Sequence, residues 1–283
     1  MRRLPVAGRM ALRRQPRLQC RSPASGARLE QLDTEPFAAT GWQGQALSCA
    51  DCAQMGRPST RCELAKACVH DRYARRIDRF FAWNPALAKE FLTHPYFEVR
   101  AVAAKHVEVF YLPRMIDDPD ATVRWSVAQR LPQRQLLMLR QDPDREVRIQ
   151  VARRLHVEQL HQMMGDGDYG VRLIVAQRIE PQWLVRMLHD EDREVRRVVA
   201  ARVGSALLGA MVKDEDAAVR TVVAQRLAPA QLVALCHDPD WRVRYSVAER
   251  IDAAHLGLLA DDEDEAVRTL ARQRSGLTGT TMT

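Results

Sequence analysis

Four of the six cysteines of this chain lie within twenty residues, in the segment CADCAQMGRPSTRCELAKAC at positions 49–68. Their spacing is Cys49-x2-Cys52-x9-Cys62-x5-Cys68, so two short-range pairs can bring four thiols together. Thiolate sulfur binds zinc ions and iron–sulfur clusters, whereas disulfides are typical of secreted chains. Because the N-terminal region lacks the apolar core of a secretory signal, we expect a metal site here.

The spacing alone leaves zinc and an iron–sulfur cluster open, and it favours zinc. The second pair is not Cys-x-x-Cys, and no proline follows the last cysteine as in bacterial ferredoxins. Gly56 and Pro58 in the intervening loop allow the tight backbone that a cluster requires, and His70 is a candidate substitute ligand. Of the other cysteines, Cys20 is incidental in a basic tail, and Cys236 replaces Met, Leu or Val of other repeats, so we expect it in the core.

A repeat of constant length follows the cysteine segment. The dipeptide Val-Arg recurs eight times at a spacing of 24, beginning at positions 99, 123, 147, 171, 195, 219, 243 and 267. One unit reads DPDREVRIQVARRLHVEQLHQMMG, at positions 142–165. Regular repetition at this period predicts a solenoid in which each unit packs on its neighbours.

Each unit contains two apolar patches. In the unit quoted above, a helical wheel places one set on a single face, which predicts a buried stripe of Val147, Val151, Ala152 and Leu155. The second patch follows thirteen and sixteen residues after the first valine, here at Leu160 and Met163. Its i, i+3 spacing, without the β-branched alternation of a strand, predicts a short 3₁₀ turn. We therefore predict an all-α fold of two layers, with long and short helices alternating and no sheet.

Acidic residues open each unit and suggest helix starts. Asp118, Asp142 and Asp238 each precede a proline, which predicts an N-cap followed by proline at the first helical position. A second acid two residues later, such as Asp120 or Asp144, is then expected in the first turn, where the helix dipole favours it. No twelve-residue calcium loop accompanies these acids, which disfavours a calcium site.

Two series of arginines recur with the repeat. One follows each valine from Arg124 to Arg268, and the other lies six residues later from Arg130 to Arg274. A ligand-binding ladder is one interpretation. We favour a structural one, in which the stems pack between layers and the guanidinium groups bind the Asp corners of adjacent units.

Some apolar residues fall outside these patches. The wheel places the residue two after the valine on the outer face, so candidate partner contacts, or else isolated exposed apolar residues, are Trp125, Ile149, Leu173 and Tyr245. Upstream of the first unit, Tyr73, Ile77, Phe80 and Phe81 have helical spacing. We expect them to cap the exposed end of the array, as solenoids require.

The net charge of +7 is concentrated near the N-terminus. Residues 1–40 hold 8 Lys+Arg and 3 Asp+Glu, residues 41–90 hold 8 and 5, and residues 91–283 hold 27 and 28. The balanced repeat gives little support to nucleic-acid binding. No apolar stretch approaches the roughly 18–20 residues that span a bilayer. We expect a cytoplasmic protein without a membrane partner.

These patterns divide the chain into four predicted segments. They are a disordered basic tail (1–40), a cysteine-ligated domain with the N-terminal cap (41–90), a repeat solenoid (91–275) and a frayed end (276–283). The tail resembles an organellar transit peptide in composition. A disordered arm is the favoured interpretation, and upstream sequence translated from an early start, with Met10 as an alternative start, is another.

The 24-residue unit with VRxxVAxRL, together with the preceding cysteines, resembles the leucine-rich repeat variant proteins of nitrogen-fixing bacteria over about residues 45–275. The resemblance implies a small N-terminal domain with a 4Fe-4S cluster on Cys49, Cys52, Cys62 and Cys68. It also implies a right-handed superhelix of alternating α and 3₁₀ helices, and a nitrogen-fixation context without an established activity. With it, an iron–sulfur cluster replaces zinc as the favoured cofactor.

No catalytic arrangement accompanies the cysteines, since the segment shows no nucleophile–base pair, phosphate loop or paired carboxylates. We therefore expect a protein-interaction scaffold rather than an enzyme, with an unidentified protein partner and oligomeric state. Its cluster would sense redox state or oxygen, carry an electron, or fasten the end cap. The alternative is a zinc-stapled structural or nucleic-acid-binding helical repeat protein.

Overall fold

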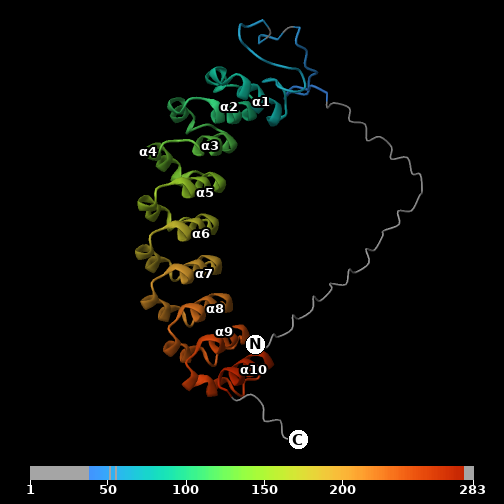
Figure 1. Cartoon of the computed structure of the whole chain (residues 1–283). Coiled ribbons are helices and arrows are strands. Elements are labelled where there is room, and N and C mark those ends of the chain that lie inside the picture. Colours follow the sequence, from blue (N-terminus) through green and yellow to red (C-terminus); the bar gives the residue numbers. More distant parts are fainter. Residues whose placement is uncertain (1–37, 51, 55, 277–283) are drawn as a thin grey trace, which may run out of the picture. The chain divides into compact units, whose positions relative to one another are not determined.

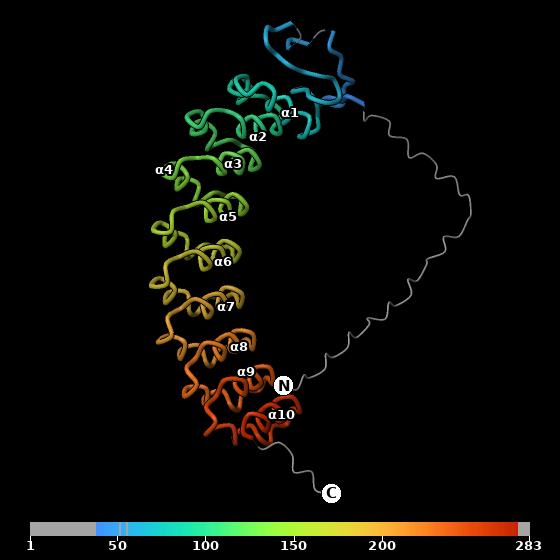
Figure 2. The backbone as a smooth tube through the Cα atoms, viewed as in Figure 1, coloured from blue at the N-terminus to red at the C-terminus, as the bar shows by residue number. Residues whose placement is uncertain are grey.

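The computed structural model describes residues 38–50, 52–54 and 56–276. Most of the predicted basic tail and residues 277–283 of the predicted frayed end lie outside this range. The described residues from Ala39 onward form one compact unit. In it the longer helices stack in one column and the short helices form a second column beside them (Figure 1), and the backbone winds between the two columns once in each repeat (Figure 2).

The predicted alternation of α and 3₁₀ helices is confirmed, and the described residues contain isolated β-bridges but no strand. The repeat α-helices are α2 (Phe97–His106), α3 (Ala121–Ala128), α5 (Arg145–Arg154), α6 (Tyr169–Arg178), α7 (Arg193–Arg202), α8 (Ala217–Arg226), α9 (Trp241–Arg250) and α10 (Glu265–Arg274). The 3₁₀ helices are η1 (Pro85–Phe91), η2 (Val109–Met115), η3 (Leu137–Gln141), η4 (Val157–Met163), η5 (Pro181–Met187), η6 (Ser205–Met211), η7 (Pro229–Leu235) and η8 (Ala253–Leu259). One further short α-helix, α4 (Gln133–Leu136), leads directly into η3.

Both predicted apolar patches are buried. The valine that opens each helical stripe is fully buried in all eight repeats, from Val99 to Val267. In the unit at 142–165, Val151, Ala152 and Leu155 are equally inaccessible, and Leu160 with Met163 buries the short helix against them. Alanine on this stripe adds little bulk, which lets successive α-helices pack closely.

The acidic corners cap the helices, but two residues later than predicted. Asp120 is the N-cap of α3 and accepts the Thr122 backbone N–H at 2.8 Å. The assignment of Asp118, Asp142 and Asp238 as N-caps was wrong. The carboxylate of Asp118 is already occupied, because it accepts the backbone N–H of Asp120 at 2.9 Å and binds an arginine of the preceding unit. Its proline therefore lies in the corner, before the helix begins.

The first arginine series joins successive units as predicted. Arg124 donates Nε and Nη2 to the two carboxylate oxygens of Asp142, at 2.7 and 2.9 Å. Its third nitrogen binds the Asp118 carbonyl oxygen of its own corner at 2.8 Å. The same bidentate ion pair recurs at Arg100–Asp118, Arg148–Asp166, Arg172–Asp190, Arg196–Asp214, Arg220–Asp238 and Arg244–Asp262. Fork-like charge-assisted bonds of this kind are among the strongest available to a side chain.

The second arginine series has a different partner from the predicted Asp corners. Arg130 donates to the carbonyl oxygens of Ala104 and Val107 at 2.9 and 2.7 Å, at the end of the preceding α-helix. Arg154 and Arg226 bind the corresponding carbonyls of their own preceding helices. The last carbonyls of a helix lack intrahelical partners and carry the negative end of its dipole, so they accept hydrogen bonds from a guanidinium that lies within reach.

The predicted placement of Trp125, Ile149, Leu173 and Tyr245 on an exposed outer face was wrong. Ile149 is 8% exposed, and Trp125, Leu173 and Tyr245 are half-buried and pack against the core. This position faces the neighbouring helix: a methyl group at Gly170, in the first turn of α6, would lie 3.4 Å from Ile149 Cδ1. A helical wheel describes one helix alone and predicts this face to be exposed. In the structure the neighbouring helix packs against it.

The predicted cap is present as α1 (Ala74–Trp83), which packs on α2. Ile77, Phe80 and Phe81 are fully buried, while Tyr73 is half-buried at the N-cap. The Phe80, Phe81 and Phe91 rings meet edge to face at 5.4–6.2 Å. Within the described part of the chain, every helix is too short or too polar to cross a bilayer.

Replacing Arg172 by Met should lower the free energy of unfolding by about 3–5 kcal/mol, because it leaves the buried Asp190 carboxylate without its counter-charge. Urea denaturation followed by circular dichroism measures the loss. Arg197→Met is the matched control, since Arg197 pairs with Glu194 on the exposed surface and its loss should have little effect. Equal destabilisation by both changes would contradict a structural role for the buried Arg–Asp pairs between successive units.

Candidate metal centre

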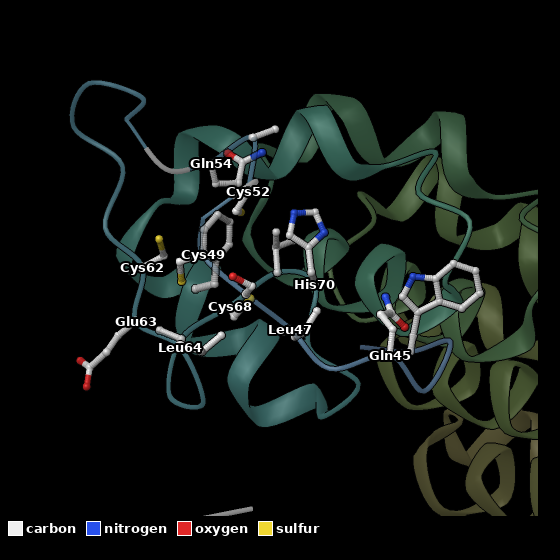
Figure 3. Close-up of a pocket in the computed structure, with 16 residues that line it drawn as sticks. Gln45, Leu47, Cys49, Cys52, Gln54, Cys62, Glu63, Leu64, Cys68 and His70 are labelled. Atoms are coloured by element: carbon white, nitrogen blue, oxygen red, sulfur yellow. The ribbon is translucent and has the colours of Figure 1, made fainter. Parts of the chain in front are cut away.

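Cys49, Cys52, Cys62 and Cys68 line one cavity of about 330 Å³. Figure 3 shows the four side chains at one end of this cavity, with His70 and Gln45 toward the other. Their residues are separated by up to nineteen positions in the chain, so the fold has gathered all the predicted ligands. Cys236 is 1% exposed within the repeats, as predicted, and Cys20 lies outside the described residues.

Asn84 positions the loop that carries Cys62. This buried residue ends α1, and its amide donates to the carbonyl oxygens of Arg61 and Phe80, both at 2.7 Å. Its carbonyl oxygen accepts the Arg61 backbone N–H at 2.8 Å. Because Arg61 immediately precedes Cys62, three hydrogen bonds from one side chain fix the third cysteine to the cap helix.

Asp71 holds the turn that follows Cys68. It is fully buried, accepts the Tyr73 backbone N–H at 3.0 Å and forms an ion pair with Arg76 at 2.8 Å. The Cys68 backbone N–H donates to the Arg76 carbonyl oxygen at 3.2 Å. The fourth cysteine is therefore tied to the first turn of α1 through both backbone and side chain.

Tight turns bend the segment around the cavity. The Cys52 backbone N–H donates to the Cys49 carbonyl oxygen at 3.4 Å, which places the first pair on one turn. Gly56 has φ of +79°, the left-handed conformation that glycine adopts without strain, in agreement with the predicted tight loop. Ala65 has φ of +60° between Glu63 and Ala67, whose backbones pair in both directions at 2.8–2.9 Å.

The environment of Cys62 and Cys68 opposes the ionisation of these two thiols in the absence of a cation. Burial raises the pKa of Cys62, and the nearby Cys49 and Cys52 raise it further by charge repulsion. Burial also raises the pKa of Cys68, although backbone hydrogen bonding from His70 and Asp71 acts in the opposite direction. Burial likewise lowers the pKa of His70, which favours the neutral imidazole.

This donor set suits a group that carries positive charge and bonds to sulfur. Four thiols line a cavity that the buried apolar side chains of Phe80 and Val69 also line. An apolar surround of this kind is a usual setting of iron–sulfur centres. Among the described residues, no three His, Cys, Asp or Glu side chains are arranged to hold a single ion.

Sequence reasoning found the four cysteines and missed the residues that position them. Asn84 stands between a helix and Pro85, where an asparagine is ordinary, and nothing marks it as buried. Asp71 and Arg76 belong to a run of charged residues that resembles a solvated surface. Their separation of five residues gave no indication that they form an ion pair next to Cys68 in the chain.

Comparison with known proteins decides the family. A solved structure described as a leucine-rich repeat variant with a novel repetitive protein structural motif superposes with a TM-score of 0.76 and 45% identity, over 81% of this chain and 98% of that one. The chain belongs to the leucine-rich repeat variant family. Residues 39–90 also match the family model described as the LRV protein FeS4 cluster, which supports an iron–sulfur cluster in the cysteine segment of this family member.

A second relative is a bacterial protein. This leucine-rich repeat variant is 51% identical over 92 residues to a Rhodobacter capsulatus protein described as an uncharacterized 27.7 kDa protein in the nifB 3' region. The match covers 32% of this chain and 38% of that relative. It is therefore a partial match, and the chain spans less than half of the relative's length.

Asn84→Leu should keep the number and branching of side-chain heavy atoms but lose the three hydrogen bonds, which leaves the backbone N–H and carbonyl groups of Arg61 without their side-chain partner, whereas the Phe80 carbonyl keeps the backbone N–H of residue 84. We expect a loss of about 1–3 kcal/mol of unfolding free energy. Hydrogen exchange should accelerate at the Arg61 and Cys62 amides. Gln177→Leu, on the exposed face of α6, is the control, and unchanged exchange at Arg61 in Asn84→Leu would contradict the positioning role.

Proposed function

We propose that this protein binds a 4Fe-4S cluster on Cys49, Cys52, Cys62 and Cys68 and presents it at one end of a protein-interaction scaffold. The observation that carries the proposal is the convergence of these four thiols on one cavity, within the residues that match the FeS4 family model. The proposal assigns the protein no catalytic step. Four thiolates occupy the ligand positions of a cubane cluster and leave no iron site for substrate.

A bound cluster would supply one-electron chemistry, and the chain's own residues would tune it. Backbone hydrogen bonding from His70 and Asp71 acts to lower the pKa of Cys68, against the effect of burial, and would stabilise negative charge on its sulfur. Phe80 and Val69 keep water from one side of the cavity. The half-exposed Cys62 leaves another side near solvent, where oxygen or a redox partner has access. These features support a redox-responsive or electron-carrying role.

The repeats support the scaffold part of the proposal. Solenoids expose long surfaces whose shape is set by the stacking of units, and they are widely used to bind proteins. We place this function in the context of nitrogen fixation because a relative is described by its position in the nifB 3' region. The partner is proposed to be a protein, since the repeat carries nearly balanced charge.

A zinc site is the second candidate, because four cysteines at this spacing also suit a tetrahedral structural zinc. Zinc would fasten the cap to the array without redox chemistry. Metal analysis separates the two.

Protein purified without oxygen should be brown and contain about four irons and four sulfides per chain. Cys62→Ala and Cys68→Ala should lose most of the iron and the visible absorbance, because each removes a ligand. Cys236→Ala, which alters a buried cysteine of the repeats, should retain both. About one zinc per chain and no colour would instead establish the zinc site.

The nitrogen-fixation context predicts that the protein and its partner are present together. Affinity capture from cells grown on dinitrogen should recover a specific protein that is missing from ammonium-grown cells. Capture with the Cys62→Ala variant tests whether the cluster contributes to the complex. Equal recovery of the same proteins under both growth conditions would contradict the context.

A further inference from the structure

A group of basic residues lies on the cysteine segment and on α1 and has no part in the proposed ligation. Arg61, Lys66 and Arg75 are exposed and Arg79 is half-buried. Arg61 and Lys66 lie over the half-buried indole of Trp83, and Leu64, which is 40% exposed, stands between them in the chain. We name this surface the basic rim; its residues are Arg61, Leu64, Lys66, Arg75, Arg79 and Trp83.

The contacts show that the basic rim is one continuous surface. The Arg61 guanidinium lies 5.3 Å from the centroid of the Trp83 ring, and Lys66 Nζ lies 5.9 Å from it. Arg79 donates to the Lys66 carbonyl oxygen at 3.2 Å. Arg75, Arg79 and Trp83 follow one another at intervals of four on α1, which places them along one face of that helix.

The charge of the basic rim is poorly neutralised. Glu63 pairs with Lys66 at 2.9 Å. Among the described residues, Arg61 and Arg75 have no carboxylate at ion-pair distance. In the repeats, by contrast, the arginines of the first series form ion pairs with aspartates of the following unit. Among the rim side chains and the carboxylate that pairs with them, four cations stand against one carboxylate, and this excess would attract an acidic partner.

The basic rim adjoins the candidate ligands in the chain and reaches the cavity at Leu64. Arg61 precedes Cys62, and Lys66 stands two residues before Cys68. Glu63 and Leu64 line the cavity that the four cysteines share, and Figure 3 shows both beside Cys62. A protein that covers Leu64 therefore comes within the length of a side chain of the cavity.

We propose that the basic rim is the docking surface for an acidic one-electron carrier protein, which exchanges an electron with the cluster. This inference rests on the proposed function. The exchange is balanced by the carrier: when the cluster gains one electron the carrier's cofactor loses one, and no bond forms or breaks. Cations that attract the carrier and a small exposed apolar centre suit the weak, fast complexes of electron transfer, which bury less than about 1,200 Å².

A nucleic acid is the other polyanion that such a surface could bind, and the charge distribution disfavours it. The basic rim is short, and residues 91–283 carry 27 Lys+Arg against 28 Asp+Glu, so no basic track continues along the array. Leu64 at the mouth of the cavity adds apolar contact, which a phosphate backbone does not use.

The test is the rate at which a reduced plant-type ferredoxin, an acidic one-electron carrier, reduces the full chain loaded with its cluster. Stopped-flow absorbance should show a rate that falls about tenfold or more between about 0.1 and about 1 M salt, as the Debye length drops from about 10 to about 3 Å. Arg61→Glu/Arg75→Glu should be at least about tenfold slower than the wild type at the lower salt concentration.

Arg193→Glu/Arg242→Glu is the matched control, because it makes the same change in charge at exposed first-turn positions of α7 and α9. It should react within about twofold of the wild type. Equal rates for the two double variants, each with full iron content, would overturn the docking inference and leave the cluster proposal intact. Absence of iron from the wild type would overturn both. Retention of a DNA oligonucleotide by the basic rim, with unchanged electron transfer, would assign the surface to nucleic acid.

Discussion

The pairing of each repeat arginine with the aspartate eighteen residues ahead is the interaction on which the rest of the array depends. A guanidinium and a carboxylate that are both mostly buried require each other, since either alone would carry an unpaired charge in an apolar layer. The same aspartate accepts the backbone N–H of the next N-cap residue, so the pair also sets where the following helix begins. One side chain thus couples the stacking of units to their internal structure.

This coupling explains why the repeat length does not vary. An insertion in either the α-helix or the short helix would move the arginine away from the corner it must reach. The second arginine series imposes the complementary condition, because it binds the carbonyls at the far end of the preceding helix. With both ends of every helix bound to a neighbour, the apolar stripe needs only small, regular side chains to fill the space between them.

Much of the fold was predictable from the sequence because it depends on local periodicity. A spacing of 24, a helical stripe and an i, i+3 pair specify alternating helices, and the buried Val147 and Leu160 agree with that prediction. The errors came from tertiary competition. Asp118 has the local sequence pattern of an N-cap, yet its carboxylate forms an ion pair with Arg100 of the preceding unit. Trp125 has the register of an outer residue, yet it is half-buried against the core.

The same distinction applies to the metal centre. Its ligands could be found because cysteine is rare and its spacing is informative, whereas Asn84 and Asp71 act through hydrogen bonds that only the folded backbone brings within reach. The match of residues 39–90 to the FeS4 cluster family model favours an iron–sulfur cluster over zinc, which the spacing alone did not.

The two arginine series bind neighbouring units on opposite sides, and this has a mechanical consequence. In each unit, the first arginine binds the aspartate of the following unit, and the second binds carbonyl oxygens of the preceding helix. Rotation of one unit over the next would therefore stretch both sets of bonds together. Such a stack should resist torsion more than a stack of helices held by apolar contact alone. The solenoid would then act as a stiff spacer, holding whatever binds along it at a set distance and angle from the sulfur-lined end.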